Sequence, residues 1–259
     1  MDVKQLFDIS GKIALITGGT AGIGEMIAEG LASAGARVWI CARRQDRLDA
    51  AVEKLGQYGE VHGIRADVST DEGIAGLVAA LEPQGRLDIL VNNAGTSIEA
   101  PLGKFPRVAF DSVMDLNVTA PFLLTQALLP LLRAAATPED PARVVNIASL
   151  VGMSAGALNH FSYSASKAAV IRLTQHLARA LARDNIAVNA LSPGFFPSEL
   201  TAEVLSDPAY KASVASPFGA RYGTAEDITG HVIFLCSRAS SWTTGINIPV
   251  SGGRRVIDA

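Results

Sequence analysis

The chain has 259 residues, of which 49% are hydrophobic and 18% charged, a composition that excludes disorder and suits one large α/β domain. A net charge of -3 gives no electrostatic reason to expect nucleic acid. The apolar runs are shorter than the roughly 18 residues of a spanning helix, and the N-terminus lacks a signal-peptide pattern. We therefore expect a cytoplasmic protein without membrane or nucleic-acid partners. Cys41 and Cys236 are expected to be reduced and buried, and the four histidines show no metal-ligand spacing.

The first predicted strand, residues 12–17, runs into a glycine-rich turn. Gly18, Gly22 and Gly24 lie between this apolar run and a helical pattern over residues 25–34. A helix N-terminus presents free N–H groups, and a missing Cβ permits close approach, so the turn is predicted to hold a phosphate group. The spacing differs from the common Gly-x-Gly-x-x-Gly fingerprint, and a tight turn without a ligand is the alternative.

Two arginines follow the second predicted strand, residues 36–41. In NAD sites an acidic residue near this point bonds the ribose 2′-hydroxyl, whereas an arginine accommodates a 2′-phosphate. Here Arg43 and Arg44 stand without the acid, so the sequence favours NADP(H), with NAD(H) still possible. The alternative is that both arginines solvate a loop before a helix at residues 46–55.

The next two predicted strands, residues 60–65 and 87–91, end in short polar side chains. Asp67 and Val68 follow the first, where an acceptor could receive an adenine amino group. Ser69 is then expected to cap a helix that runs to about residue 81. Asn92, Asn93, Ala94 and Gly95 follow the second, at the edge where doubly wound sheets bind ligands.

Residues 110–135 form a long predicted helical region that contains Asn117, and Pro121 and Pro130 are expected to break its regularity. An asparagine inside a helix is unfavourable unless its side chain has a local task. It either bonds the backbone and bends the helix or holds a water, and the pattern allows both.

Strands predicted at residues 143–148, 185–190 and 245–250 alternate with helices at 163–182 and 226–237. This alternation predicts an α/β fold: one domain over residues 1–259, with a doubly wound parallel sheet of about seven strands and helices on both faces. Residues 195–223 contain three prolines and little strand signal, which suits a substrate lid. Several aromatic and aliphatic residues in it suggest an apolar pocket, or packing against the body or a second subunit.

Tyr163 and Lys167 are four residues apart in a predicted helix and therefore share one face. A nearby ammonium favours the phenolate, so this spacing predicts a tyrosine acid with a lowered pKa. A half-buried tyrosine beside a solvated lysine gives the same spacing. The motifs at the other element boundaries decide between a catalytic pair and a structural one.

Together these motifs resemble the short-chain dehydrogenase/reductase family over nearly the whole chain. The matching positions are Thr17, Gly18, Gly22, Ile23, Gly24, Asp67, Asn92, Asn93, Ala94, Gly95, Asn117, Ser149, Tyr163, Lys167, Pro193 and Gly194. Residues 193–201 also resemble the corresponding run of 3-oxoacyl-carrier-protein reductases and, with residues 117–119 and 128–132, of rhamnolipid-synthesis-type NADPH-dependent ketoreductases. Ala21 is a departure, because NADPH-preferring members often carry a basic residue there.

The resemblance implies a Rossmann-type fold, carbonyl–alcohol oxidoreductase activity, and a homotetramer or homodimer. It implies a catalytic tetrad of Asn117, Ser149, Tyr163 and Lys167. It also implies that Lys167 holds the cofactor ribose as well as the Tyr163 phenol. The implied cofactor contacts are Gly18, Thr20, Gly22, Ile23 and Gly24 at the pyrophosphate, Asp67 and Val68 at adenine, Asn93, Ala94 and Gly95 along the cofactor, and Pro193, Gly194, Phe196 and Ser198 near the carboxamide.

Rival interpretations come from other motifs and from the fold itself. Ser154 lies in a Gly-x-Ser-x-Gly run with Asp227 and His231 downstream, the order of a serine hydrolase, although the preceding strand ends too early. A non-catalytic dinucleotide sensor would keep the fold without needing Ser149, Tyr163 and Lys167 together. Within the oxidoreductases, a 3-oxoacyl thioester or other apolar ketone is the leading substrate. An NAD-dependent dehydrogenase of a cyclic, steroid or sugar-derived alcohol is the alternative.

Overall fold

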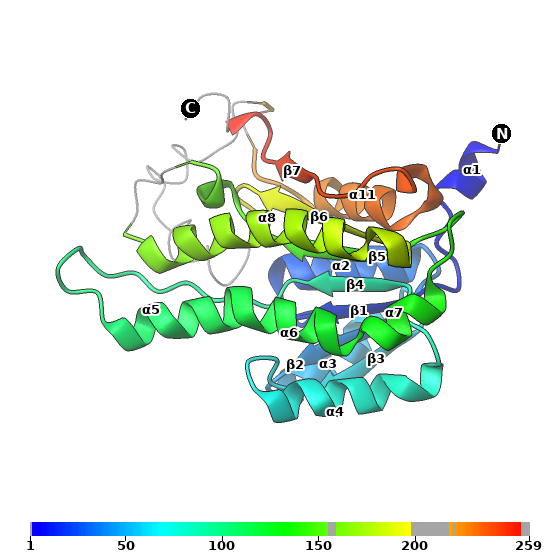
Figure 1. Ribbon diagram of the computed structural model, residues 1–259, viewed down its shortest axis with the longest axis horizontal. Coiled ribbons are helices and arrows are strands. Elements are labelled where there is room, and N and C mark those ends of the chain that lie inside the picture. Colours follow the sequence, from blue (N-terminus) through cyan, green and yellow to red (C-terminus); the bar gives the residue numbers. More distant parts are fainter. Residues whose placement is uncertain (1, 155–158, 198–217, 220, 255–259) are drawn as a thin grey trace.

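One seven-stranded parallel sheet organises the chain in the computed structural model, which describes residues 2–154, 159–197, 218–219 and 221–254 (Figure 1). The strand order is β3-β2-β1-β4-β5-β6-β7, and every pairing is parallel. The sequence-based prediction of seven strands in a doubly wound sheet is therefore confirmed. The strands are β1 (Ile13–Thr17), β2 (Arg37–Ala42), β3 (Val61–Arg65), β4 (Ile89–Asn92), β5 (Ala142–Ile147), β6 (Ile186–Pro193) and β7 (Asn247–Val250).

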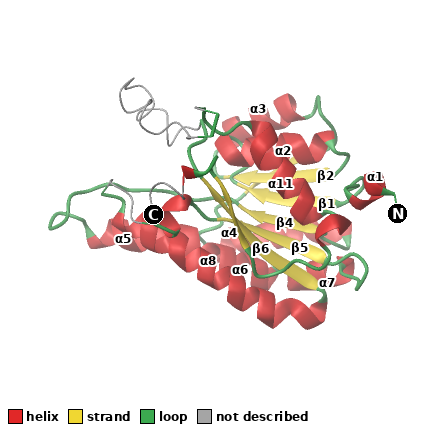
Figure 2. Cartoon of the chain, turned by 90° about the horizontal axis from the view of Figure 1, so that it is seen from above, coloured by secondary structure: helices red, strands yellow, loops and turns green. Residues whose placement is uncertain are grey.

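Helices cover both faces of the sheet (Figure 2). One layer contains α2 (Gly22–Ser33), α3 (Gln45–Leu55) and α11 (Ala225–Cys236), and the other contains α4 (Asp71–Leu81), α6 (Ala120–Ala127) and α8 (Phe161–Leu181). The remaining helical elements are α1 (Val3–Leu6), η1 (Glu82–Gln84), α5 (Arg107–Met114), η2 (Asp115–Thr119), α7 (Leu129–Ala135), η3 (Leu150–Gly152), η4 (Ala182–Asp184) and η6 (Arg238–Ser240).

Strands β1, β4, β5 and β6 are buried along their whole length, because each side of the sheet centre faces a helix layer. In β1, Ala14 and Ile16 pack towards α2 and α11, whereas Ile13 and Leu15 pack towards α4 and α6. Burying an aliphatic side chain of this size stabilises the fold by about 1.5–3 kcal/mol relative to leaving it exposed. The continuous apolar runs in the sequence thus reflect two cores separated by one sheet.

The direction of strand addition reverses between β1 and β4. From β1 the chain proceeds to β2 and β3 on one side, then crosses to place β4 on the other side of β1. The connections leaving these two strands therefore diverge and leave a crevice at their carboxyl ends, which is where doubly wound sheets bind ligands. Thr17 and Asn92 are the last residues of the two strands.

The predicted helical region over residues 110–135 covers residues 107–135 in the structure. It continues through Pro121 and breaks at Leu128, where residues 107–127 and 129–135 meet at 58°. A π-helical turn, η2, precedes Pro121, and Pro130 lies in the first turn of α7, where its missing N–H costs little. The expectation that the two prolines break the regularity of this region agrees with the structure, because the π-helical turn directly precedes the first turn of α6, which holds Pro121, and the bend directly precedes α7.

Two helix starts also differ from the prediction. Helix α2 begins at Gly22 instead of residue 25, because packing in the turn overrides the poor helix propensity of glycine. Thr70, not Ser69, caps α4: its Oγ1 accepts a hydrogen bond from the Gly73 N–H at 3.0 Å. Ser69 instead donates to the Asp67 carboxylate at 2.6 Å.

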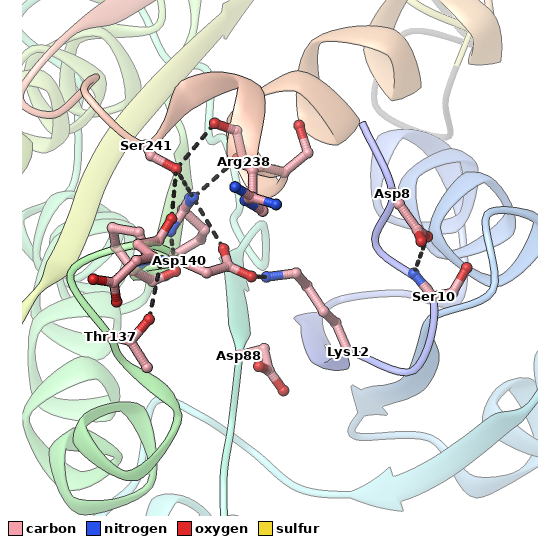
Figure 3. A network of polar contacts seen from close by, with 12 residues as sticks. Asp8, Ser10, Lys12, Asp88, Thr137, Asp140, Arg238 and Ser241 are labelled. Atoms are coloured by element: carbon pink, nitrogen blue, oxygen red, sulfur yellow. Dashed lines mark hydrogen bonds and ion pairs between the residues drawn. The ribbon is translucent and has the colours of Figure 1, made fainter. Parts of the chain in front are cut away.

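A polar network lies at the amino end of the sheet (Figure 3). Lys12 Nζ donates to Asp140 Oδ2 at 2.6 Å, and the Asp140 N–H donates to Thr137 Oγ1 at 3.0 Å. Arg143 of β5 is 1% exposed; its Nε donates to the Leu235 carbonyl at 3.1 Å and its Nη2 to the Ser237 carbonyl at 2.9 Å. This network ties the end of α11 to β5.

Cys41 and Cys236 are free and buried, as predicted, and burial raises the pKa of each thiol to about 12. Within the described ranges, no single helix is both long and apolar enough to cross a membrane. Only the bent pair 107–127 and 129–135 reaches that length and composition together. The same ranges contain no cluster of three or more His, Cys, Asp or Glu side chains suited to a metal.

Candidate active site

The glycine turn and the end of β4 are joined by Thr17 and Asn93. Thr17 is 2% exposed, and its Oγ1 accepts hydrogen bonds from the Asn93 and Ala94 N–H groups at 3.0 and 2.9 Å. In return, Asn93 Nδ2 donates to the Thr17 and Gly18 carbonyls at 3.0 and 3.1 Å. The side chain of Thr17 thus fixes the floor of the crevice, a role that the sequence reasoning did not assign.

Close packing explains the glycines of this turn. Gly18 and Gly22 have φ values of 66° and 57°, in the left-handed region that favours glycine. A Cβ on Gly24 would collide with the Gly18 carbonyl and with Asn93 Nδ2. Helix α2 starts here without a side-chain cap, so its first N–H groups point into the crevice. Ile23 packs its side chain on the core and leaves only its backbone to the turn.

Beside this turn lies a pocket of about 210 Å³ that gathers most of the predicted nucleotide contacts. Gly18, Thr20, Arg43, Arg44, Asp67 and Val68 line it, with Ala94 and Gly95 on the same wall. Arg47 and Leu116 also line it and were missed by the sequence reasoning. Arg47 lies in the first turn of α3, shortly after the two predicted arginines, and a third arginine at this position is a signal that could have identified it.

The two predicted arginines stand at the solvent side of this pocket. Arg43 has 73% of its side chain exposed and lies 3.9 Å from the Asp67 carboxylate. Arg44 precedes α3, and its Nε donates to Asp46 at 3.1 Å. Both pairings are solvent-exposed and therefore weak, so either guanidinium can turn to an incoming anion at small cost.

The predicted carboxamide side begins where β6 ends. The Gly194 N–H donates to the Val250 carbonyl at 2.9 Å, which joins residues 193–194 to β7. Phe196 is 2% exposed and belongs to the core between the sheet and α11, so only its backbone is available to a ligand. Ser198 and most of the predicted lid, residues 198–217 and 220, lie outside the described residues.

Tyr163 and Lys167 stand on the first turns of α8, on the same face, as their spacing predicts. Lys167 is 5% exposed, and its Nζ lies 5.6 Å from the centre of the Tyr163 ring. Its ammonium donates to the Ile147 carbonyl, at the end of β5, at 2.7 Å. Ser149 follows Ile147 by two residues, and its hydroxyl is near enough to the Tyr163 phenol to lower the pKa of that phenol. Strand β5 and helix α8 therefore bring the three side chains together.

Burial controls the protonation of this cluster. It raises the pKa of the Tyr163 phenol, and the Ser149 hydrogen bond only partly opposes that change. Burial also lowers the pKa of Lys167 from 10.5 to about 8. The expectation that Lys167 lowers the Tyr163 pKa therefore differs from the structure, because removal from water outweighs the attraction of an ammonium that stands beside the ring.

Asn117 lies in the π-helical turn η2 and is 1% exposed. Its Oδ1 accepts from the Thr96 N–H at 2.8 Å, and its Nδ2 donates to the Thr96 carbonyl and to Ser166 Oγ, both at 2.9 Å. Ser166 Oγ donates in turn to the Tyr163 carbonyl at 2.7 Å. The Asn117 side chain therefore bonds the backbone of another segment, at Thr96, and Ser166 links it to α8.

Another polar cluster borders Tyr163 and was not found from the sequence. Ser97 Oγ lies 2.6 Å from His160 Nδ1, and the His160 and Tyr163 ring centroids are 6.1 Å apart. The two partners are 63 residues apart in the chain, and neither belongs to a recognisable motif.

The rival hydrolase triad is not assembled. The Asp227 carboxylate accepts from Arg221 Nη2 at 2.9 Å and from the Thr224 N–H at 2.8 Å, as part of a capping box. His231 Nδ1 instead meets the Asp227 backbone carbonyl at 2.7 Å, and Ser154 Oγ donates weakly to the Leu150 carbonyl at 3.5 Å. The carboxylate therefore does not orient the imidazole, which a serine nucleophile requires.

The site suits a dinucleotide that ends beside Tyr163. A Cβ on Gly95 would lie 3.1 Å from Asn117 Oδ1 and 3.6 Å from Lys167 Nζ, so this glycine keeps the path from the nucleotide pocket to the lysine open. The uncapped start of α2 offers N–H groups to a pyrophosphate, and the arginines offer charge to a phosphate at the far end. The chain can thus hold a phosphorylated dinucleotide against a phenol, a hydroxyl and an ammonium.

Comparison with known proteins agrees with this geometry. Residues 12–209 match the family model of the short chain dehydrogenases. A Pseudomonas aeruginosa protein named as the rhamnolipids biosynthesis 3-oxoacyl-[acyl-carrier-protein] reductase is 46% identical over 95% of this chain and 97% of its own length. Gluconate 5-dehydrogenase of Gluconobacter oxydans is 36% identical over 98% of each chain. The solved Pseudomonas aeruginosa RhlG/NADP active-site complex superposes with a TM-score of 0.93 at 43% identity, covering 97% of this chain and 99% of that one.

The chain therefore belongs to the short-chain dehydrogenase/reductase family and is an oxidoreductase of that family. Its fold, a single parallel sheet with helices on both faces, is that of the RhlG structure.

Proposed function

We propose that this protein is an NADP(H)-dependent reductase that converts a ketone carbonyl to a secondary alcohol, with a 3-oxoacyl thioester as its substrate. The observation that carries the proposal is the meeting of Ser149, Tyr163 and Lys167 at the carboxyl edge of the sheet, at the end of a pocket lined by arginines. The names of the Pseudomonas relatives support both the cofactor and the substrate class.

When bound, the nicotinamide cofactor supplies hydride. Tyr163 donates its proton to the carbonyl oxygen, and Ser149 donates a hydrogen bond to the same oxygen, so that negative charge is stabilised where it develops. Lys167 keeps donors available beyond its bond to the Ile147 carbonyl, because an ammonium has three, and these hold the ribose hydroxyls. Asn117 fixes the Thr96 backbone and, through Ser166, the start of α8.

The raised pKa of Tyr163 favours the reductive direction. A phenol whose pKa lies above its ordinary value of 10 stays protonated at neutral pH and is ready to act as an acid. Oxidation of the alcohol requires the phenolate as a base, which becomes populated only as the pH rises. Activity in the oxidative direction is therefore expected to rise with pH through the alkaline range.

The test of the function is NADPH oxidation against a short panel of 3-oxoacyl thioesters, cyclic ketones and sugar-derived ketones. The wild type is expected to reduce the 3-oxoacyl thioesters with the largest kcat/KM. Tyr163→Phe keeps the ring but removes the acid, and it is expected to lower kcat by about 10³-fold while NADPH still binds. Near-normal turnover by this variant would refute the role of Tyr163.

A second experiment addresses the cofactor. Arg43→Ala combined with Arg44→Ala is expected to raise the KM for NADPH by about tenfold and to leave that for NADH nearly unchanged, because only NADPH carries the 2′-phosphate. Equal losses with the two cofactors contradict the assignment. Arg107→Ala is a matched control, since Arg107 is an exposed arginine on α5 that pairs with Asp111.

We also propose a homotetramer or homodimer. The support is a set of exposed aromatic side chains on the outer layer, Phe110 of α5, Phe122 of α6 and Phe161 of α8, each between 37% and 40% exposed. Light scattering after size exclusion tests this, and a monomer contradicts it.

A further inference from the structure

Ser97, Glu99 and His160 form a second polar cluster beside the Tyr163 ring. The imidazole connects the other two: its Nδ1 lies 2.6 Å from Ser97 Oγ and its Nε2 lies 3.7 Å from a Glu99 carboxylate oxygen. The imidazole and phenol rings meet at 63° with centroids 6.1 Å apart. The cluster therefore flanks the ring of the catalytic tyrosine, and the tetrad makes no use of it.

The loop that carries Ser97 and Glu99 is fixed by backbone contacts on both sides of the cluster. On one side, the Thr96 N–H and carbonyl are both bonded to Asn117. On the other, the Ala100 N–H donates to the Asn159 carbonyl at 3.4 Å. These contacts already join the loop to η2 and to the start of α8. The side chain of His160 is therefore not needed to hold the loop in place.

The contacts of His160 define which ring nitrogen carries the proton. The nearby Glu99 carboxylate favours a proton on Nε2, and in that tautomer Nδ1 accepts a hydrogen bond from Ser97 Oγ. The separation of 3.7 Å from Glu99 is too long for a hydrogen bond. The His160 side chain is 26% exposed, and within the described chain its Nε2–H makes no hydrogen bond. The ring that flanks Tyr163 thus carries a partly exposed nitrogen that can donate to a ligand.

We propose that His160 Nε2–H recognises a second carbonyl oxygen on the substrate, the thioester oxygen of a 3-oxoacyl group whose 3-keto oxygen meets Tyr163. This inference rests on the proposed function and extends it. A 3-oxoacyl thioester carries its two carbonyls two carbons apart, so one molecule presents an oxygen to the phenol and another to the imidazole. Ser97 and Glu99 act as positioning residues, because they orient the ring without contacting the reacting atoms.

The cluster also accounts for selection against other ketones. A simple ketone leaves the His160 donor unmatched, and a site built to bond a substrate oxygen discriminates against an analogue that lacks it. A carboxylate at the same position of a substrate would face Glu99 and be repelled. The selectivity ratio between a 3-oxoacyl thioester and a matched monoketone is therefore the quantity that His160 controls.

The experiment measures kcat and KM for NADPH-dependent reduction of the N-acetylcysteamine thioester of 3-oxobutanoate and of 2-pentanone. His160→Phe is expected to lower the thioester-to-ketone ratio of kcat/KM by about tenfold, mostly through KM, the effect of one lost hydrogen bond. His160→Asn, which retains a donor, is expected to keep most of the ratio. Ser97→Ala is expected to lower it about threefold because the tautomer is no longer fixed, and Ser97→Thr to restore it.

His62→Phe is the matched control, because His62 also contacts a glutamate, Glu60 at 2.8 Å, but lies on the edge strand β3. Thermal melting and NADPH titration confirm that each variant is folded. If His160→Phe lowers kcat/KM equally for the two substrates, or changes neither value, the thioester-to-ketone ratio stays the same. His160 then serves the structure alone, and the inference is overturned while the proposed function stands. If the wild type reduces only the ketone, or neither compound, the 3-oxoacyl assignment itself fails.

Discussion

Two buried cations lie at opposite ends of the sheet, and their surroundings differ. Arg143, at the amino end, is 1% exposed and directs its guanidinium at the carbonyls of Pro141, Leu235 and Ser237, with the Asp140 carboxylate 3.4 Å away. Lys167, at the carboxyl end, is 5% exposed and donates to one carbonyl, that of Ile147.

The difference separates a structural charge from a functional one. Burial lowers the pKa of Arg143 as well, but this side chain directs most of its five N–H donors at fixed backbone acceptors, and these contacts hold α11 on β5. Lys167 is removed from water and has one acceptor, the Ile147 carbonyl. Its pKa is lowered because this single bond does not offset the loss of hydration of the ammonium. A buried cation with spare donors at a crevice is ready to bind something else, here the cofactor ribose and the oxygen of Tyr163.

The largest expected effect comes from removing the functional cation. Lys167→Met keeps a long side chain but loses the donors, and kcat is expected to fall by about 10³-fold, equivalent to about 4 kcal/mol of activation free energy. Steady-state reduction of a 3-oxoacyl thioester measures it. Lys54→Met, which removes an exposed lysine of α3 paired with Glu25, is the control. A loss below tenfold would show that Lys167 is as structural as Arg143.

Removing the structural cation, Arg143, is expected to lower the stability of the fold and to leave kcat nearly unchanged. Arg143→Met leaves the buried carbonyls of Leu235 and Ser237 without their donors. The free energy of unfolding is therefore expected to fall by about 3–4 kcal/mol. Urea unfolding of the protein without nucleotide measures the change. At temperatures where the variant remains folded, kcat is expected to stay within about twofold of wild type. A large selective loss of kcat in a fully folded sample contradicts the comparison.

The pH dependence of stability tests the uncompensated burial of Lys167. Its folded pKa of about 8 lies below the ordinary 10.5, so the unfolded chain binds more protons between these values and stability rises with pH across that window. The shift corresponds to about 3 kcal/mol. Lys167→Met is therefore expected to be more stable than wild type by about that amount at pH 7, with the difference closing by pH 10.5. A difference that does not vary with pH shows that the lysine is not destabilised by burial.

The sheet was predictable because its central strands are buried on both faces. Parallel strands of this kind read as continuous apolar runs, and all seven runs were found within a few residues of their ends. Boundaries at glycines and hydroxyls were less accurate. Gly22 starts α2 against its own propensity because the turn packs on Asn93, and Ser69 and Thr70 are chemically equivalent candidates for one cap.

The candidate site was predictable where its members share one helix turn. The spacing of Tyr163 and Lys167 requires a common face, but spacing carries no information about burial, which reverses the expected change in the Tyr163 pKa. Contacts between distant segments were also out of reach. Thr17 with Asn93, Ser166 with Asn117 and Ser97 with His160 each join residues at least 49 positions apart, and no local pattern marks them.

The smallest expected effect concerns Lys12, a partly buried cation at the amino end of the sheet. Its side chain is 11% exposed and donates to Asp140 Oδ2, which is partly open to solvent. A double-mutant cycle with Lys12→Met, Asp140→Asn and the combined variant is expected to give a coupling of about 1 kcal/mol in the free energy of unfolding. The combined variant is needed because Asp140 also faces Arg143, and the cycle separates the two interactions.

Since Lys12 meets a full negative charge near solvent, added salt is expected to reduce its coupling, whereas the contribution of Arg143, made to buried carbonyls, should persist. A coupling that does not respond to salt would place Lys12 with Arg143 in the buried part of the network.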